Sequence, residues 1–290
     1  MQFQVKQGFV QDEATDLLVV NLFEGAPEPS GALKAVDQAL NGLVSQIIAA
    51  GDIKGKLGEA QVLYSSNSAL PAQRVLITGL GKQADFGVAQ ARKAAAAAAR
   101  KARELGVSRL TTVVHGAGQG GLDAAAAAQA VAEGTLLGGY RYRGHKRNGN
   151  DKPEIAEVIV LEADGSKIEA VQQGVAAGQV VGDAANWARD LVNEPPNYLT
   201  PKEMARRVVE RAEAVGLKTQ VFGEAEMAEL GMGSFLGIAR GSDEEGQFIV
   251  LEHIPQGYDL ASLPTVALVG KAITFDTGGI SIKPAENMWK

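Results

Sequence analysis

Three charged side chains near the end of the sequence stand at spacings that could support chemistry. Lys271 directly follows the apolar run 265–270, Asp276 comes five residues later, and Lys283 follows after seven more. Such a run is typical of a buried strand, and open α/β sheets bind ligands at the carboxyl ends of their strands. Because unpaired buried charges are costly, we interpret these three residues as a candidate site.

A carboxylate beside a lysine amine can hold a divalent metal ion if the amine is neutral. Two neighbouring cations would favour the neutral amine by lowering its pKa. A second lysine that stays protonated could stabilise a developing oxyanion. The alternative is an exposed turn, in which Asp276 caps Gly278 and Gly279 and the lysines extend into water. Spacing alone leaves both interpretations open.

Length and composition restrict the class of protein. The chain has 290 residues, a formal net charge of −6 and no cysteine, which excludes disulfides and thiolate metal sites. The net charge gives no overall basic footprint for nucleic acid. The sequence shows neither a signal peptide nor an apolar stretch long enough to cross a membrane. We therefore expect a cytoplasmic protein without membrane contact.

Apolar runs and helical periodicity alternate along the chain. Strands are predicted at 3–5, 16–22, 61–64, 74–79, 110–115, 155–161, 218–222, 248–253 and 265–269. Helices are predicted at 32–49, 88–105, 122–137, 166–191, 201–215 and 224–230. Alternation of this kind favours an α/β fold with mostly parallel sheets covered by helices.

The long helix divides the pattern into two α/β blocks. We predict an N-terminal α/β domain at 1–165, a connecting helix at 166–192 and a second domain at 193–290. The second block ends on the strand 265–269 and its loop, with no helix after them. We therefore expect the second domain to be incomplete.

Two other groups of residues have weaker claims to function. The segment 116–121 reads G-x-G-x-x-G between a strand and a helix, but a dinucleotide site also needs an acidic residue at the end of the next strand. A tight turn is favoured over a phosphate or nucleotide site. The histidines His115, His145 and His253 form no metal-spaced pair, so structural roles are favoured.

A basic loop lies within the first block, between the predicted helix 122–137 and the predicted strand 155–161. It is either a solvated loop or a contact for nucleic acid or another anion. Its charged and titratable residues are Arg141, Arg143, His145, Lys146 and Arg147.

Segment 269–284, VGKAITFDTGGISIKP, closely resembles the signature of the cytosolic leucyl aminopeptidase family of dinuclear-metal exopeptidases. Segment 193–201, NEPPNYLTP, is similar to the start of that family's catalytic domain, and 231–242 resembles its next Gly-rich stretch. Three matches in the same order over about a hundred residues make the resemblance specific. Residues 1–165 resemble the family's variable N-terminal domain only in architecture and position.

The resemblance implies roles for the three charged residues. Lys271 would be a ligand of one metal ion, Asp276 would bridge two, and Lys283 would polarise the scissile carbonyl and stabilise the tetrahedral intermediate. The two ions would be Mn²⁺ or Zn²⁺, with Mg²⁺ as a further candidate. Peptides would be the substrates, and the family's members are cytoplasmic hexamers. Some bacterial members also bind DNA.

The chain departs from the family pattern in two respects. Ala272 stands where the family usually has glycine, and three further carboxylate ligands and a catalytic arginine would come after Lys290. Loss of one ligand is already damaging, so we expect these 290 residues alone to lack peptidase activity. The alternative is a non-catalytic DNA-binding or assembly protein that uses the N-terminal domain.

Overall fold

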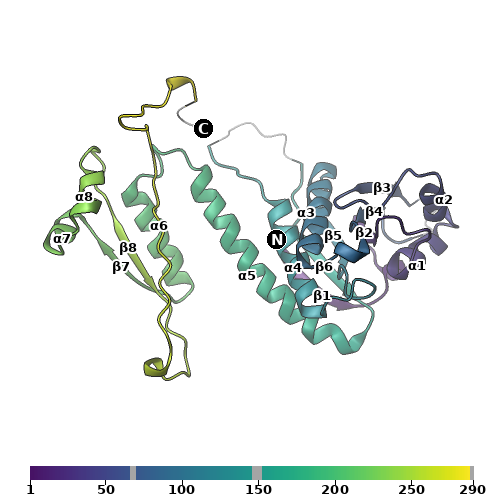
Figure 1. Ribbon diagram of the computed structural model, residues 1–290. Coiled ribbons are helices and arrows are strands. Elements are labelled where there is room, and N and C mark those ends of the chain that lie inside the picture. The colour runs from purple at the N-terminus through teal and green to yellow at the C-terminus, as the bar shows by residue number, and fades with distance from the viewer. Residues whose placement is uncertain (66–69, 146–151, 288–290) are drawn as a thin grey trace. The chain divides into compact units, whose positions relative to one another are not determined.

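A computed structural model describes residues 1–65, 70–145 and 152–287 of the chain. It comprises two compact units, Met1–Asp190 and Leu191–Lys290, and each is described by itself (Figure 1). The predicted domain limits, 1–165 and 193–290 with a connecting helix at 166–192, stay a prediction. No helix among the described residues is long and apolar enough to cross a membrane.

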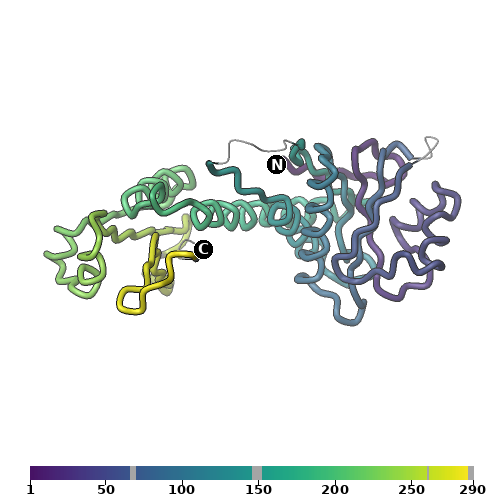
Figure 2. Tube along the Cα trace, turned by 90° about the horizontal axis from the view of Figure 1, so that it is seen from above, coloured from purple at the N-terminus to yellow at the C-terminus, as the bar shows by residue number. Residues whose placement is uncertain are grey.

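The first unit is built on a six-stranded sheet with the order β1-β6-β5-β2-β4-β3. Its strands are β1 (Gln2–Gln7), β2 (Leu17–Leu22), β3 (Ala60–Tyr64), β4 (Arg74–Gly79), β5 (Arg109–Val113) and β6 (Glu157–Glu162). Only the edge strand β3 is antiparallel to its neighbour. Figure 2 shows the same unit from above. The mostly parallel sheet expected of this α/β fold is confirmed.

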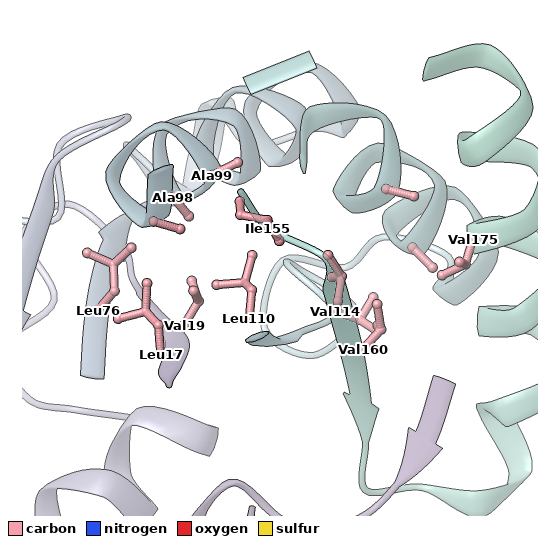
Figure 3. Close-up of a cluster of buried hydrophobic side chains, with 14 of the residues drawn as sticks. Leu17, Val19, Leu76, Ala98, Ala99, Leu110, Val114, Ile155, Val160 and Val175 are labelled. Atoms are coloured by element: carbon pink, nitrogen blue, oxygen red, sulfur yellow. The ribbon is translucent and has the colours of Figure 1, made fainter. Parts of the chain in front are cut away.

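Helices cover both faces of this sheet. They are α1 (Gly31–Ala39), α2 (Leu43–Ala49), α3 (Val88–Leu105), α4 (Ala124–Gly139) and α5 (Ile168–Asn193). Along β2, Leu17 and Val19 belong to the core under α3 and α4 (Figure 3), whereas Leu18 and Val20 belong to the core under α1 and α2. Side chains alternate between the faces of a strand, so a strand buried on both faces is a continuous apolar run.

The helix predicted at 32–49 is wrong, because the chain forms two helices there. Asn41 and Gly42 have φ angles of 54° and 81°, and a left-handed backbone ends a helix. The carboxylate of Asp37 accepts hydrogen bonds from the backbone N and Oγ of Ser45, at 3.0 and 2.6 Å. These bonds stabilise the first turn of α2.

Glycines let α3, α4 and α5 approach closely. A Cβ on Gly134 of α4 would lie 2.3 Å from the carbonyl oxygen of Arg92 in α3. A Cβ on Gly174 of α5 would lie 2.1 Å from the carbonyl oxygen of Ala125 in α4. Real Cβ atoms do not come this close to a backbone oxygen, so these positions require glycine. Direct backbone contact of this kind attaches α5 to the first unit.

A buried carboxylate also joins α3 to α4. Glu133 is 3% exposed. Its side chain forms an ion pair with Arg92 of α3 and accepts a hydrogen bond of 2.8 Å from Gln129 Nε2. A buried charge needs such partners.

The second unit contains α6 (Pro201–Ala214), β7 (Lys218–Phe222), α7 (Glu224–Glu229), α8 (Gly233–Ala239) and β8 (Phe248–Glu252). Strands β7 and β8 pair in antiparallel fashion. The glycine-rich stretch 231–242 contains α8, a helix the sequence did not predict. We attribute the miss to glycine at 233, 237 and 241, since glycine disfavours helix.

The predicted buried strand at 265–269 is wrong. Nothing in the described part of the chain pairs with it, and its backbone is not in a strand. Val266, Leu268 and Val269 are 78%, 95% and 96% exposed. An apolar run predicts burial, but burial also requires neighbouring elements, and none of the described residues supplies them here.

Candidate active site

A tight turn brings two of the three predicted residues together. The backbone N of Lys283 donates a hydrogen bond of 2.8 Å to the carbonyl oxygen of Thr277. Gly278 lies inside this turn with a φ of 90°, and a Cβ there would be 2.1 Å from the carbonyl oxygen of Ser281. Position 278 therefore requires glycine on two grounds, conformation and space. The sequence indicated a Gly-Gly turn but not which glycine the turn requires.

Asp276 and Lys283 form an ion pair across the turn. Lys283 Nζ lies 3.1 Å from Asp276 Oδ2 and 3.0 Å from the Asp276 carbonyl oxygen. The other carboxylate oxygen, Oδ1, accepts a hydrogen bond of 2.8 Å from Gly278 N. The Gly278 N–H and then Lys283 lower the pKa of the Asp276 carboxyl below its ordinary value. Both carboxylate oxygens of Asp276 are thus engaged within the turn.

Lys271 takes a smaller part in this arrangement. Its charge contributes to the lowered pKa of Asp276, but less than Gly278 and Lys283 do. Its side chain is exposed and makes no hydrogen bond or ion pair within the described range. The side chains of Lys283 and Asp276 are also 46% and 60% exposed. The three charges are close in sequence and accessible to water, not buried at the end of a strand.

These donors do not by themselves fit two divalent ions. Within 1–65, 70–145 and 152–287, no group of three or more His, Asp or Glu side chains could hold a metal ion. Mg²⁺ and Mn²⁺ prefer sites with several oxygen ligands, and the turn offers one carboxylate beside two lysines. The turn therefore supplies at most part of a metal site.

The segment that resembles the start of the family's catalytic domain forms a well-defined helix start. The carbonyl oxygen of Pro195 accepts hydrogen bonds from the backbone N of Tyr198 and Leu199, at 2.9 and 3.0 Å. Thr200 caps α6 by accepting a hydrogen bond of 3.4 Å from Glu203 N. A threonine directly before a proline at the first helical position is a typical helix start.

Two arginines hold Glu203 in its ionised form. Hydrogen bonds from Arg206 and then Arg207 lower the pKa of Glu203 to about 2. Arg207 also pairs with Glu194 at 3.2 Å, which ties the segment before α6 to the helix. These contacts stabilise the start of α6, and we interpret them as structural.

An aromatic ring fills the glycine-rich loop after β5. A Cβ on Gly116 or Gly120 would lie 2.2 or 2.7 Å from the Phe86 ring. The side chain of Asp123 caps α4 through Ala126 N at 3.0 Å and places a negative charge at the helix N-terminus. Phosphate prefers a helix N-terminus free of such a charge. This geometry favours the tight turn.

His115 lies beside that loop and is 1% exposed. Its Nε2 is 3.0 Å from Thr112 Oγ1. Burial lowers the pKa of His115 to about 4, which keeps the imidazole neutral at pH 7. Among the described residues, none of the three histidines belongs to a group of three or more side chains that could bind a metal ion.

The basic loop is partly outside the structural description, since Lys146 and Arg147 are not described. Within the described part, Arg143 pairs with Glu154 at 2.5 Å. Arg141 lines a cavity of 260 Å³ whose other charged residues are Arg103, Glu104, Lys152 and Glu154. Carboxylates therefore offset part of the positive charge.

Comparison with known proteins shows the family to which the chain belongs. The cytosol aminopeptidase family, N-terminal domain, matches residues 19–149, and the catalytic domain of the same family matches residues 186–290. The chain belongs to the cytosol aminopeptidase family. The catalytic-domain match contains the whole segment from Lys271 to Lys283.

Curated relatives extend this assignment over nearly the whole chain. A probable cytosol aminopeptidase of Roseiflexus castenholzii is 40% identical over 99% of this chain and 56% of its own length. One from Alkaliphilus metalliredigens is 33% identical over 99% of this chain and 57% of its own length. The chain thus spans about half the length of the curated relatives it matches.

Solved structures show the same fold. The bottromycin maturation enzyme BotP in complex with Mn matches with a TM-score of 0.74 and 32% identity, over 95% of this chain and 52% of that chain. A variant of tomato leucine aminopeptidase matches with a TM-score of 0.82 and 24% identity, over 97% and 55%. At that identity the tomato protein supports the fold alone.

Proposed function

We propose that residues 271–283 contribute to the active site of a metal-dependent aminopeptidase that releases N-terminal residues, such as leucine, from peptides in the cytoplasm. The observation that carries the proposal is the turn, which pairs Asp276 with Lys283 at 3.1 Å inside the segment matched by the family's catalytic domain. The relatives' printed names supply the reaction class.

Each residue has a proposed part in the complete site. Lys271 and Asp276 are proposed as ligands of divalent metal ions, for which Mn²⁺ and Zn²⁺ are the first candidates and Mg²⁺ the next. Lys283 is proposed as the group that stabilises negative charge on the reacting carbonyl oxygen. To act there, its ammonium group must exchange part of its contact with Asp276 for a contact with substrate.

We further propose that a polypeptide of these 290 residues has no peptidase activity by itself. The physical reason is the donor count, since Asp276 is the only carboxylate of residues 271–283. The test is an assay with leucine anilide and added Mn²⁺, together with calorimetric titration of the metal. We expect no turnover and no stoichiometric binding of two ions. Turnover typical of an enzyme, at or above about 1 s⁻¹, would contradict the proposal.

A test of the roles proposed for individual residues requires a catalytically active protein. A suitable one is a chimera in which residues 1–290 replace the matching part of the Roseiflexus castenholzii protein, with the remainder of that protein following. We expect Asp276→Asn and Lys283→Ala to lower kcat/KM by about a hundredfold or more. Lys218→Ala is the matched control, because Lys218 is exposed and remote in sequence, and it should change kcat/KM by less than about twofold. An active Asp276→Asn chimera would refute the assignment.

DNA binding by the first unit is the second candidate function. The observation in its favour is the group of Arg103, Arg141 and Lys152 around one cavity, and two carboxylates in the same lining weaken it. Fluorescence anisotropy with a labelled duplex tests this function. Binding should weaken steeply with salt and with Arg141→Gln. Absence of binding at low salt would exclude it.

A further inference from the structure

An open cavity of 450 Å³ lies beyond the end of β2 in the first unit. Two segments line it, 24–27 directly after β2 and 48–56 around the end of α2. Its volume falls in the range of about 300–1,000 Å³ that is typical of small-molecule sites. The carboxyl end of a parallel strand is also where open α/β sheets bind their ligands.

Backbone and side-chain hydrogen bonds hold the walls of this cavity in place. Gly25 N donates to the carbonyl oxygen of Lys54 at 3.2 Å and joins the two segments. The carboxylate of Glu59 accepts from the backbone N of Lys54 and of Lys56, at 3.0 and 3.1 Å. The shape is therefore largely formed before any ligand arrives.

The lining combines an apolar wall with charges of both signs. Ile48, which is half-buried, supplies apolar surface together with Ala26 and Pro27, and Ile53 lies in the hydrophobic core beneath. The charged lining residues are Glu24, Lys54 and Lys56. Within the described residues, none of these three side chains makes a hydrogen bond or ion pair. One carboxylate and two ammonium groups are thus left to interact with a ligand.

We propose that this cavity binds an α-amino acid with an apolar side chain. The ammonium group of such a ligand complements Glu24 and its carboxylate complements Lys54 and Lys56. Its side chain packs on Ile48, Ala26 and Pro27. A simple anion would leave Glu24 without a partner, and a simple cation would meet two lysines. The proposal is independent of the proposed aminopeptidase function, because residues 271–283 take no part in it.

The first test is a titration of the ¹⁵N-labelled chain with L-leucine, followed by NMR of the backbone amides. We expect saturable shifts at residues 24–27 and 48–56, with a Kd of about 1 mM for a ligand of this size. N-acetyl-L-leucine lacks the ammonium charge and L-leucinamide lacks the carboxylate. Each should bind at least about fivefold more weakly.

Substitutions at the cavity provide the second test. Glu24→Gln, and Lys54→Gln combined with Lys56→Gln, should each weaken leucine binding at least about fivefold. Lys34→Gln, at an exposed position on α1 outside the lining, is the matched control and should leave the Kd unchanged.

Three results would overturn the proposal. One is the absence of saturable shifts at leucine concentrations about ten times the expected Kd. Another is a set of shifts confined to residues outside the two segments. The third is equal affinity for leucine and both analogues, a comparison on the unchanged chain that stays decisive even if a variant fails to fold.

Discussion

Acid should destabilise the first unit through one buried side chain, His115. The imidazole is neutral in the folded protein, where its pKa is about 4, against an ordinary value of 6.5. A group whose folded pKa is lowered in this way binds its proton more readily in the unfolded state. Stability is therefore fully present above pH 6.5 and is lost as pH falls from 6.5 towards 4.

The size of the effect follows from the two pKa values. A difference of about 2.5 units corresponds to about 3 kcal/mol once pH is well below 4. Between pH 7 and pH 5 the loss is about 2 kcal/mol. Domains have a total stability of about 5–15 kcal/mol, so this part of the pH dependence should be measurable.

The assay must report on the first unit alone, because two units need not unfold together. Hydrogen exchange of β2, measured by mass spectrometry and corrected for intrinsic rates, meets this requirement, since Leu17 to Val20 are fully buried. The perturbation is His115→Gln, which keeps a polar group near Thr112 without a titratable ring. We expect this variant to be less stable at pH 7 but to lose about 2 kcal/mol less than the parent between pH 7 and pH 5.

Ile77→Val is the control for destabilisation without a change in titration. Ile77 is a fully buried apolar residue of β4, and its loss of a methylene should cost about 1 kcal/mol at every pH. The parent and His115→Gln losing the same stability between pH 7 and pH 5 would refute the reasoning. His115 would then not be a neutral, buried imidazole.

Three further substitutions test other contacts. Gly174→Ala should lower the free energy of unfolding of the first unit by about 1–3 kcal/mol, because its Cβ meets a backbone oxygen of α4; hydrogen exchange of β2 measures this. Arg92→Met should cost about 1–3 kcal/mol in the same assay, since the buried Glu133 carboxylate loses its ion pair with the partly exposed Arg92 but keeps its hydrogen bond from Gln129. Gly278→Ala should disrupt the turn and separate Lys283 from its carboxylate partner. The pKa of that carboxyl, followed by ¹³C NMR, should then rise towards its ordinary value.

Local sequence patterns predicted most of the first unit for a clear physical reason. Its strands are short apolar runs such as 17–22 and 74–79, and its helices carry alanine-rich or periodic apolar stretches. Both patterns report burial, and in this unit the sheet and its helices bury one another. The order of strands could not be predicted, because it depends on which crossovers pack together and not on any one segment.

The secondary-structure predictions at 32–49 and 265–269 are wrong because contacts with other residues, and not the local pattern, determine the structure there. At 41–42 a side-chain hydrogen bond from Ser45 to Asp37 favours two helices over one. At 265–269 the apolar run lacks a partner among the described residues, so neither a strand nor burial results.

The candidate site was located by spacing and chemical type, and the structure adds the geometry. The sequence could indicate that Asp276 and Lys283 flank a Gly-Gly turn. It could not indicate that Lys283 contacts both the carboxylate and the carbonyl oxygen of Asp276. That contact depends on the backbone angles at Gly278 and Gly279. Glycine can adopt many backbone angles, so the sequence does not determine them.

The glycine contacts between α4 and α5 determine which substitutions the long helix can accept. Gly174, Gly178 and Gly182 recur every four residues on the side of α5 that faces α4. Val180 and Val181, by contrast, are 72% and 47% exposed. A comprehensive mutational scan of α5 should therefore show intolerance at the three glycines and at the buried Val171 and Val175, and broad tolerance at the exposed positions. In protein engineering, labels and cross-links belong at the tolerant positions, where they leave the docking of the helix intact.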